Sequence, residues 1–273
     1  MKLVFFGSGD YVIPVIEALK KDFEPFIITT EKEKQNPLIK YSIENKIPYV
    51  SISAFDENIK LIISNLKSDV AVLANFRLII PKQILNTFKF GVLNIHPSLL
   101  PKYRGATPGQ TAILNEDKTT GVSIIKLDEE MDHGPVLAQK EEEILANDTS
   151  ESLYLRLFKV GAELLKDTIH NYLNNEVKLI EQNHKLATYS NKLSKEDGYI
   201  DYKNPPDNLR RIIKAYYPWP GVWIKTNLKN KNTRIKLLPN NKIQVEGKKP
   251  MSYRDFLNGY NEGKIILEKL QLF

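Results

Sequence analysis

The sequence predicts an α/β fold: a Rossmann-like, mostly parallel sheet domain followed by a small OB-like, β-rich C-terminal domain. In the first half of the chain, short apolar runs alternate with stretches whose apolar residues recur at helical spacing. Short connections join these segments, which favours right-handed crossovers and a sheet covered by helices on both faces. Towards the end of the chain, strand-like segments separated by Asn and Gly turns replace this alternation.

The elements of the first half are predicted in a regular order. Residues 2–6 (KLVFF) form a buried strand, and GSGD then turns into a helix that carries Val12, Val15, Ile16 and Leu19. Further strands are predicted at residues 25–30, 47–50, 69–74, 91–95, 119–127 and 134–141. Further helices are predicted at residues 37–46, 56–66 and 107–116.

The clearest helix lies at residues 147–173. Asp148 is expected to cap it, with Glu151 three residues later, and one apolar stripe is expected to run along Leu153, Leu157, Val160, Leu164 and Leu173. After a polar connecting stretch, a short helix is predicted at residues 207–217, and short strands then run to the end. The expected domains are therefore a Rossmann-like sheet domain at 1–185, a linker at 186–203 and a small OB-like domain at 204–273.

Composition excludes some classes of function. The 273 residues include no Cys, so disulfides, a thiol nucleophile and Cys-ligated metals are excluded. The opening MKLVFFGSGD reads directly as a strand and a turn, and no apolar run approaches the length of a membrane span, so a cytoplasmic protein is expected. The formal net charge of +6 fits a polyanionic partner, but it fits a general abundance of Lys equally well.

A polar pair ends the predicted strand at residues 91–95, in the stretch GVLNIHPSLLPKYRGATPGQ. Asn94 and His96 are two residues apart, so they share one face of the strand, at the sheet edge where α/β proteins bind ligands. If Asp132, from the later turn DEEMDHG, folds back onto His96, its carboxylate would raise the pKa of the imidazole, and the imidazolium could stabilise an oxyanion. From spacing alone, the alternative is that Asn94 and His96 only cap the end of the strand. The turn SGD at residues 8–10 lacks the full G-x-G-x-x-G, so a dinucleotide site is not expected there.

The segments NIHPSLLPKYRG and DEEMDHGPVLAQ together resemble the signature of the folate-dependent formyltransferase family. The resemblance covers nearly the whole chain. KLVFFGSGDYVIPVIEALKK is similar to the opening strand and helix of the family. NKLSKEDGYIDYKNP and IIKAYYPWPGVW are similar to the linker and C-terminal domain of the members that act on methionyl-tRNA.

The resemblance implies a role for several sets of residues. The catalytic trio would be Asn94, His96 and Asp132, acting on 10-formyltetrahydrofolate and a substrate amine without a metal or a covalent enzyme intermediate. The pterin would be held by Phe76, Arg77, Leu78, Ile79 and Ile80, with Asp128 in the loop that closes over it. The mouth of the site, where the acceptor enters, would be lined by Ser98, Tyr103, Arg104 and Gly105.

The acceptor implied by the two-domain resemblance is initiator methionyl-tRNA. Candidate contacts for it are Lys192, Lys195, Arg210, Arg211, Lys214 and the Lys-rich residues 225–236. The chain has only TTEKEKQNPLIKYS where the tRNA enzymes carry a basic insertion, and it has Arg77 after the predicted strand at 69–74. These departures keep an amino-sugar nucleotide open as the alternative acceptor. A non-catalytic folate- or RNA-binding module is the less expected third reading.

Overall fold

The computed structural model describes residues 1–30, 32 and 35–273. The stretch TTEKEKQNPLIKYS, expected to lack the basic insertion, includes residues 31 and 33–34, which lie outside the described residues. The chain divides into two compact units. One comprises Met1–Pro108, Thr119–Glu143 and Tyr154–Ser190, and the other comprises Gly109–Lys118, Ile144–Leu153 and Asn191–Phe273. The domain limits expected at residues 185 and 203 stay a prediction.

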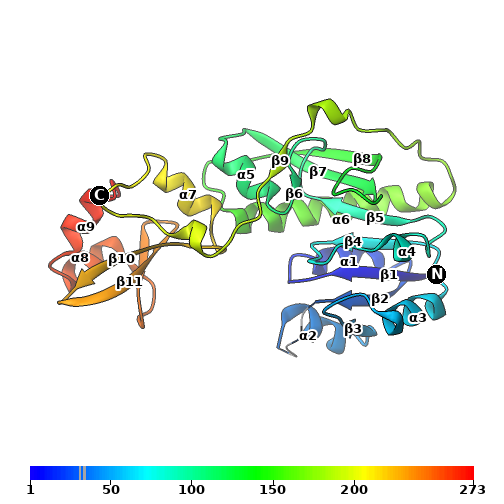
Figure 1. Cartoon of the computed structure of the whole chain (residues 1–273), viewed down its shortest axis with the longest axis horizontal. Helices are drawn as coiled ribbons and strands as arrows, with labels where there is room; N and C mark the ends of the chain where they lie inside the picture. Colours follow the sequence, from blue (N-terminus) through cyan, green and yellow to red (C-terminus); the bar gives the residue numbers. More distant parts are fainter. Residues whose placement is uncertain (31, 33–34) are drawn as a thin grey trace. The chain divides into compact units, whose positions relative to one another are not determined.

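A seven-stranded sheet forms the centre of the first unit, in the order β3-β2-β1-β4-β5-β7-β8 (Figure 1). The first five strands in this order are parallel to one another, and β7 is antiparallel to both of its neighbours, β5 and β8. This confirms the mostly parallel α/β prediction. The strands are β1 (Lys2–Gly7), β2 (Glu24–Thr29), β3 (Tyr49–Ser51), β4 (Ala71–Ala74), β5 (Val92–His96), β7 (Thr119–Lys126) and β8 (Val136–Glu143).

Helices α1 (Ile13–Leu19), α2 (Pro37–Glu44), α3 (Glu57–Leu66) and α4 (Lys82–Leu85) connect the parallel strands. Asp56 caps α3 by accepting a hydrogen bond from the backbone N–H of Ile59 at 2.9 Å. The buried residues Ile59 and Ile63 of this helix join a cluster with Val4 and Phe6 of β1. The apolar face of this helix and the apolar strand thus pack together in one layer of the core.

The long helix α6 (Ser150–Leu173) confirms the helix predicted there, and Leu153 and Leu157 are buried as expected, but the cap and the later part of the stripe were predicted wrongly. Thr149 caps it, because its Oγ1 accepts a hydrogen bond from the backbone N–H of Ser152 at 3.2 Å. A Cβ on Gly161 would lie 2.6 Å from Ile95 of β5, so the helix turns its glycine to the sheet. The buried stripe therefore runs along Leu153, Leu157, Gly161, Leu165, Ile169 and Tyr172.

The direction of strand addition reverses between β1 and β4, which are neighbours in the sheet. In parallel sheets ligands bind at such a switch point, outside the carboxyl ends of the strands. The loops that follow these two strands meet there, because Asn75 Nδ2 donates a hydrogen bond to the main-chain oxygen of Ser8 at 2.7 Å. Strand β5 lies next to β4, so it ends at the same edge.

A second, two-stranded ladder lies beyond that edge. β6 (Arg104–Gly105) pairs in parallel with β9 (Tyr189–Ser190). A short 3₁₀ helix, η1 (His184–Leu186), precedes β9. The start of the stretch expected to be a polar connection therefore contains a 3₁₀ helix at 184–186 and, at 189–190, a strand paired with the segment that follows β5.

The second unit contains a four-stranded antiparallel sheet, β10 (Val222–Leu228), β11 (Lys231–Leu238), β12 (Lys242–Val245) and β13 (Met251–Ser252). Its helices are α5 (Pro108–Leu114, with Pro108 in the first unit), η2 (Glu196–Gly198), α7 (Leu209–Ala215), α8 (Tyr253–Gly259) and α9 (Gly263–Lys269). The prediction of strands running to the end was wrong for α8 and α9. Ser252 and Asp255 form a capping box that starts α8, and Phe256 and Leu267 are fully buried.

Candidate active site

Asn94 and His96 lie on one side of β5, and both side chains are buried. Ile95 between them points the other way, towards α6. The strand ends at His96 because Pro97 follows, and the main-chain oxygen of His96 instead accepts a hydrogen bond from the N–H of Ser98 at 2.9 Å. The local sequence therefore places an amide and an imidazole side by side at the carboxyl edge of the sheet.

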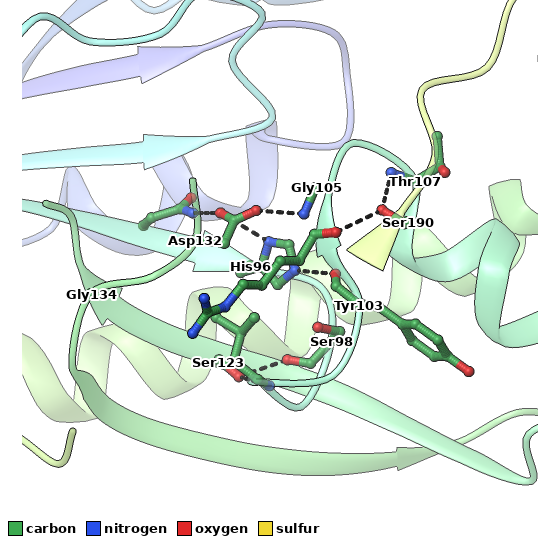
Figure 2. Close-up of polar contacts among 12 residues, drawn as sticks. His96, Ser98, Tyr103, Gly105, Thr107, Ser123, Asp132, Gly134 and Ser190 are labelled. Carbon is green, nitrogen blue, oxygen red and sulfur yellow. Dashed lines mark hydrogen bonds and ion pairs between the residues drawn. The ribbon is translucent and has the colours of Figure 1, made fainter. Parts of the chain in front are cut away.

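Asp132, from the connection between β7 and β8, completes a cluster with this pair (Figure 2). Its Oδ1 accepts a hydrogen bond from Asn94 Nδ2 at 3.2 Å and lies 3.4 Å from His96 Nδ1. Its Oδ2 accepts a hydrogen bond from the backbone N–H of Gly105 at 2.8 Å. The three residues that the sequence grouped as a trio are thus in direct contact.

The contact made by Nε2 of His96 shows that this ring nitrogen carries a hydrogen. Nε2 lies 3.0 Å from the main-chain oxygen of Tyr103, and a carbonyl oxygen only accepts, so Nε2 carries a hydrogen. Burial on its own lowers the pKa of His96, but the Asp132 carboxylate and the Tyr103 carbonyl outweigh burial and raise this pKa above its ordinary value of 6.5. The raised pKa extends the pH range in which Nδ1 also carries a hydrogen and the ring is an imidazolium.

Asp132 is shifted in the complementary direction. Burial on its own raises the pKa of its carboxyl group, but the charge of His96 and the N–H of Gly105 bring this pKa below the ordinary value of 3.8. Both shifts favour the charged forms, an imidazolium beside a carboxylate, in a site screened from water. Such a charge, held in place before any reaction, can stabilise a negative charge that develops on a substrate oxygen.

Arg104 lies behind this pair, not at an open surface. Its side chain is buried, and Nε and Nη2 donate to Gln182 Oε1 at 3.2 and 2.7 Å. Nη2 also lies 2.8 Å from His184 Nδ1, and the His184 ring stacks on His133 with ring centres 3.9 Å apart. The guanidinium of Arg104 thus binds Gln182 and His184, which lie in the same unit but about 80 residues further along the chain.

The loop from Ser98 to Gly105 is held by a hydrogen bond within the loop and by hydrogen bonds from residues 188–190. Ser98 is fully buried, and its Oγ donates to the main-chain oxygen of Lys102 at 2.5 Å. The N–H of Tyr103 donates to Thr188 Oγ1 at 2.9 Å, and Ser190 Oγ donates to the main-chain oxygen of Arg104 at 3.1 Å. The loop therefore offers the site a Tyr103 carbonyl and a Gly105 N–H, both from the backbone.

Sequence reasoning missed Gln182, His184, Thr188 and Ser190. They lie in a polar stretch without periodicity, and such a stretch is typical of a surface connection. The only signal in the sequence is the concentration of hydrogen-bonding side chains in QNHKLATYS, where an exposed linker would need none.

The residues predicted to hold a pterin lie on two loops that meet at the same edge. Phe76 packs on Phe6, with ring centres 5.5 Å apart, and Leu78 joins the same apolar cluster. Ile79 is 88% exposed, which is unusual for an isoleucine in a folded unit. Lys82 pairs with Glu129 at 2.5 Å, which joins the end of this segment to the loop that carries Asp128 and Asp132.

Asp128 itself holds its own loop. One carboxylate oxygen accepts from the N–H of Glu130 at 3.0 Å, and the other lies 2.6 Å from His133 Nδ1. His133 thus takes part in the structure of this loop. The structure brings both predicted pterin loops to the edge where Asn94 and His96 end their strand.

Two protein-family models match this sequence. The family described as formyl transferase matches residues 1–169, and the formyl transferase C-terminal domain matches residues 192–241. The chain belongs to the formyl transferase family. The first match includes Asn94, His96 and Asp132, and the second includes α7, β10 and β11.

Individual relatives extend this result over the whole chain. A methionyl-tRNA formyltransferase of Buchnera aphidicola subsp. Schizaphis graminum is 35% identical over 238 residues, which cover 83% of this chain and 76% of that protein. One from Alkaliphilus oremlandii is 30% identical over 98% of this chain and 100% of that protein. Among solved structures, an N-formyltransferase of Helicobacter canadensis, in complex with folinic acid and dTDP-3-aminofucose, has a TM-score of 0.65 and 20% identity. That likeness covers 90% of this chain and 95% of the other and shows the fold alone.

Proposed function

We propose that this protein transfers the formyl group of 10-formyltetrahydrofolate to the amino group of methionine on initiator methionyl-tRNA. The observation that carries the proposal is the contact of Asn94, His96 and Asp132 at the carboxyl edge of the sheet, in a chain of the formyl transferase family. The choice of acceptor is supported by relatives named methionyl-tRNA formyltransferase that match both domains. We also propose that the protein is cytoplasmic; none of the described helices is long and apolar enough to span a membrane.

The two loops at the sheet edge fit a folate donor. A pterin is a flat ring with polar edges, so it needs apolar contact on its faces and backbone groups at its rim. Phe76, Leu78 and the exposed Ile79 supply apolar surface, and Arg77, Ile80 and Asp128 belong to the same two loops. The complex of the Helicobacter canadensis relative with folinic acid supports a folate at this fold.

The reaction that we propose needs no metal. The methionyl amine attacks the formyl carbon, a C–N bond forms, and the carbonyl electrons move onto the formyl oxygen. As the tetrahedral intermediate collapses, the bond between the formyl carbon and N10 of the folate breaks. The amine loses one proton and N10 gains one, so the protons balance.

Each residue of the cluster has a separate part in this scheme. His96 supplies a fixed positive charge beside the developing oxyanion, and Asp132 keeps that ring protonated. Asn94 Nδ2 has two N–H groups, of which the contact with Asp132 uses one, so the second serves as an oxyanion donor. Ser98 and Arg104, both buried, shape the acceptor entrance from behind, while Tyr103 and Gly105 contribute through their backbone.

The experiment that tests the acceptor is a parallel formylation assay with 10-formyltetrahydrofolate. Initiator tRNA charged with methionine is compared with uncharged tRNA, free methionine and a panel of amino-sugar nucleotides. We expect turnover with the charged tRNA alone. Turnover restricted to an amino sugar would overturn the tRNA proposal and retain the formyl transfer. Absence of turnover with every amine, together with folate binding, would favour a non-catalytic binding module.

A further inference from the structure

Gln182 makes four hydrogen bonds with its side-chain amide. Oε1 accepts from Nε and Nη2 of Arg104 at 3.2 and 2.7 Å. Nε2 donates to the main-chain oxygens of Asp132 at 2.9 Å and of Gly134 at 2.7 Å. Since an amide offers two N–H groups and two lone pairs, every hydrogen-bonding position is filled. The side chain is also buried.

The backbone that Gln182 holds has an unfavourable conformation. Asp132 has a φ of +51°, in the left-handed region that a residue with a Cβ adopts only at a cost. Surrounding contacts must maintain such a conformation. The N–H of Gly105 holds the carboxylate of Asp132 from one side, and Gln182 holds the main-chain oxygens on either side of His133.

Arg104 determines which way the amide faces. A guanidinium only donates, so the oxygen of Gln182 must face it, and both N–H groups then point at the loop. A flipped amide would put N–H groups against N–H groups. His184 Nδ1 lies 2.8 Å from Nη2, the same guanidinium nitrogen that donates to Gln182, and so gives Arg104 a second contact.

We propose that Gln182, oriented by Arg104, is a positioning residue that sets where the Asp132 carboxylate lies relative to the His96 ring. The distance between Asp132 Oδ1 and His96 Nδ1 is 3.4 Å, so a shift of a few tenths of an ångström decides whether the contact forms. The inference rests on the proposed function for its kinetic consequence. The position of the Asp132 carboxylate relative to the His96 ring can be tested without any substrate.

The test is Gln182→Ala, measured in two ways. We expect kcat to fall about 10- to 100-fold, with KM for both substrates within about threefold, because misplacement by about 1 Å costs on the order of 100-fold in rate. We also expect the pKa of His96, measured by proton NMR without substrate, to fall towards 6.5 as Asp132 moves away. Arg104 also faces the ring, and its charge acts in the lowering direction. The chain has four His, so His96→Ala identifies the signal.

Gln139→Ala is the matched control. Gln139 Nε2 also donates two hydrogen bonds, to the main-chain oxygen of Leu100 and to Ser123 Oγ, both at 2.8 Å, but it makes no bond to the Asp132 loop. We expect it to lower the melting temperature while kcat stays within about twofold and the pKa of His96 is unchanged. A Gln182→Ala protein with either the wild-type kcat or the wild-type His96 pKa would show that Gln182 is structural only, and would overturn the proposal.

If Gln182→Ala does not fold, Gln182→Glu replaces it. A glutamate keeps two acceptor oxygens for Arg104 but loses the N–H groups that hold Asp132 and Gly134. We expect a folded protein with kcat reduced about 10- to 100-fold, and a wild-type kcat would overturn the proposal. If the wild-type protein formylates no charged tRNA, the proposed function fails, and the His96 titration of Gln182→Ala still decides the positioning role.

Discussion

His96 Nε2 donates a hydrogen bond to the main-chain oxygen of Tyr103, seven residues further along the chain, at 3.0 Å. The segment that leaves β5 therefore folds back and holds the ring at the end of its own strand. Since Asp132 faces the other nitrogen, both N–H groups of the imidazolium are engaged. The ring can offer a substrate its fixed positive charge, and Asn94 is the residue beside it with an N–H group left to donate.

Replacing His96 by alanine tests the charge directly. We expect His96→Ala to reduce kcat by about 10³-fold while the affinity for the folate stays within several-fold, because the proposed pterin loops do not depend on His96. Single-turnover kinetics and folate titration measure the two quantities. His170→Ala is the control, since His170 is exposed and pairs with Asp22. Comparable activity of the two variants would remove His96 from catalysis.

The ion pair should make stability depend on pH in a defined window. The pKa of Asp132 is lowered, so its contribution is present above 3.8 and is lost as pH falls through the folded-state pKa. The pKa of His96 is raised, so its contribution is present below 6.5 and is lost as pH rises through the folded-state pKa. We expect the difference in unfolding free energy between wild type and Asp132→Asn to be largest between these limits. Urea unfolding from pH 3 to 9 measures it, and a difference independent of pH would contradict the ion pair.

Gly105 should be intolerant of a side chain. It has a φ of +106°, and a Cβ there would lie 2.8 Å from the main-chain oxygen of Ser190. We expect Gly105→Ala to destabilise the protein by about 3 kcal/mol and to reduce kcat, because it displaces the N–H that holds Asp132. Gly247→Ala separates the two causes, since Gly247 also has a positive φ, of +73°, but has open space around it. That control should cost about 1 kcal/mol with no change in kcat.

The exposed Ile79 should contribute to binding of the formyl donor and not to the stability of the fold. We expect Ile79→Asp to raise KM for 10-formyltetrahydrofolate about tenfold or more, because a buried isoleucine side chain contributes about 1.5–3 kcal/mol. Thermal unfolding should be unchanged, since the side chain is 88% exposed. Leu61→Asp is the control, as Leu61 is exposed on α3. Equal KM values for the two variants would exclude Ile79 from the pterin site.

Periodicity and chain order were enough to predict the sheet domain and to place Asn94 and His96 on one face at the end of a strand. The grouping of Asp132 with them came from the family resemblance, because the pattern alone did not show that its loop folds back onto His96. Gln182, Thr188 and Ser190 could not be found in this way. Their partners are about 50 to 86 residues away, and a pairing at that distance depends on the path of the whole chain.

The stripe of α6 shows a different limit. Helical spacing is compatible with more than one face, and hydrophobicity favoured the face with Val160 and Leu164. The packing instead selects the face with Gly161, because the absence of a side chain there allows the helix backbone to approach Ile95. Close approach depends on shape, which a hydrophobic pattern does not record.

The pairing of β6 with β9 bears on the order in which a growing polypeptide can become an enzyme. Arg104 and Ser190 are separated by 86 positions, and a ribosome adds roughly 5–20 residues per second. Arg104 is thus synthesised roughly 4–17 s before Ser190, the residue that holds it. From the addition of residue 132 until that of residue 182, the nascent chain carries both His96 and Asp132 without Gln182 or Ser190 to hold them. The capacity to formylate therefore arises late in translation, when residue 190 has cleared the exit tunnel.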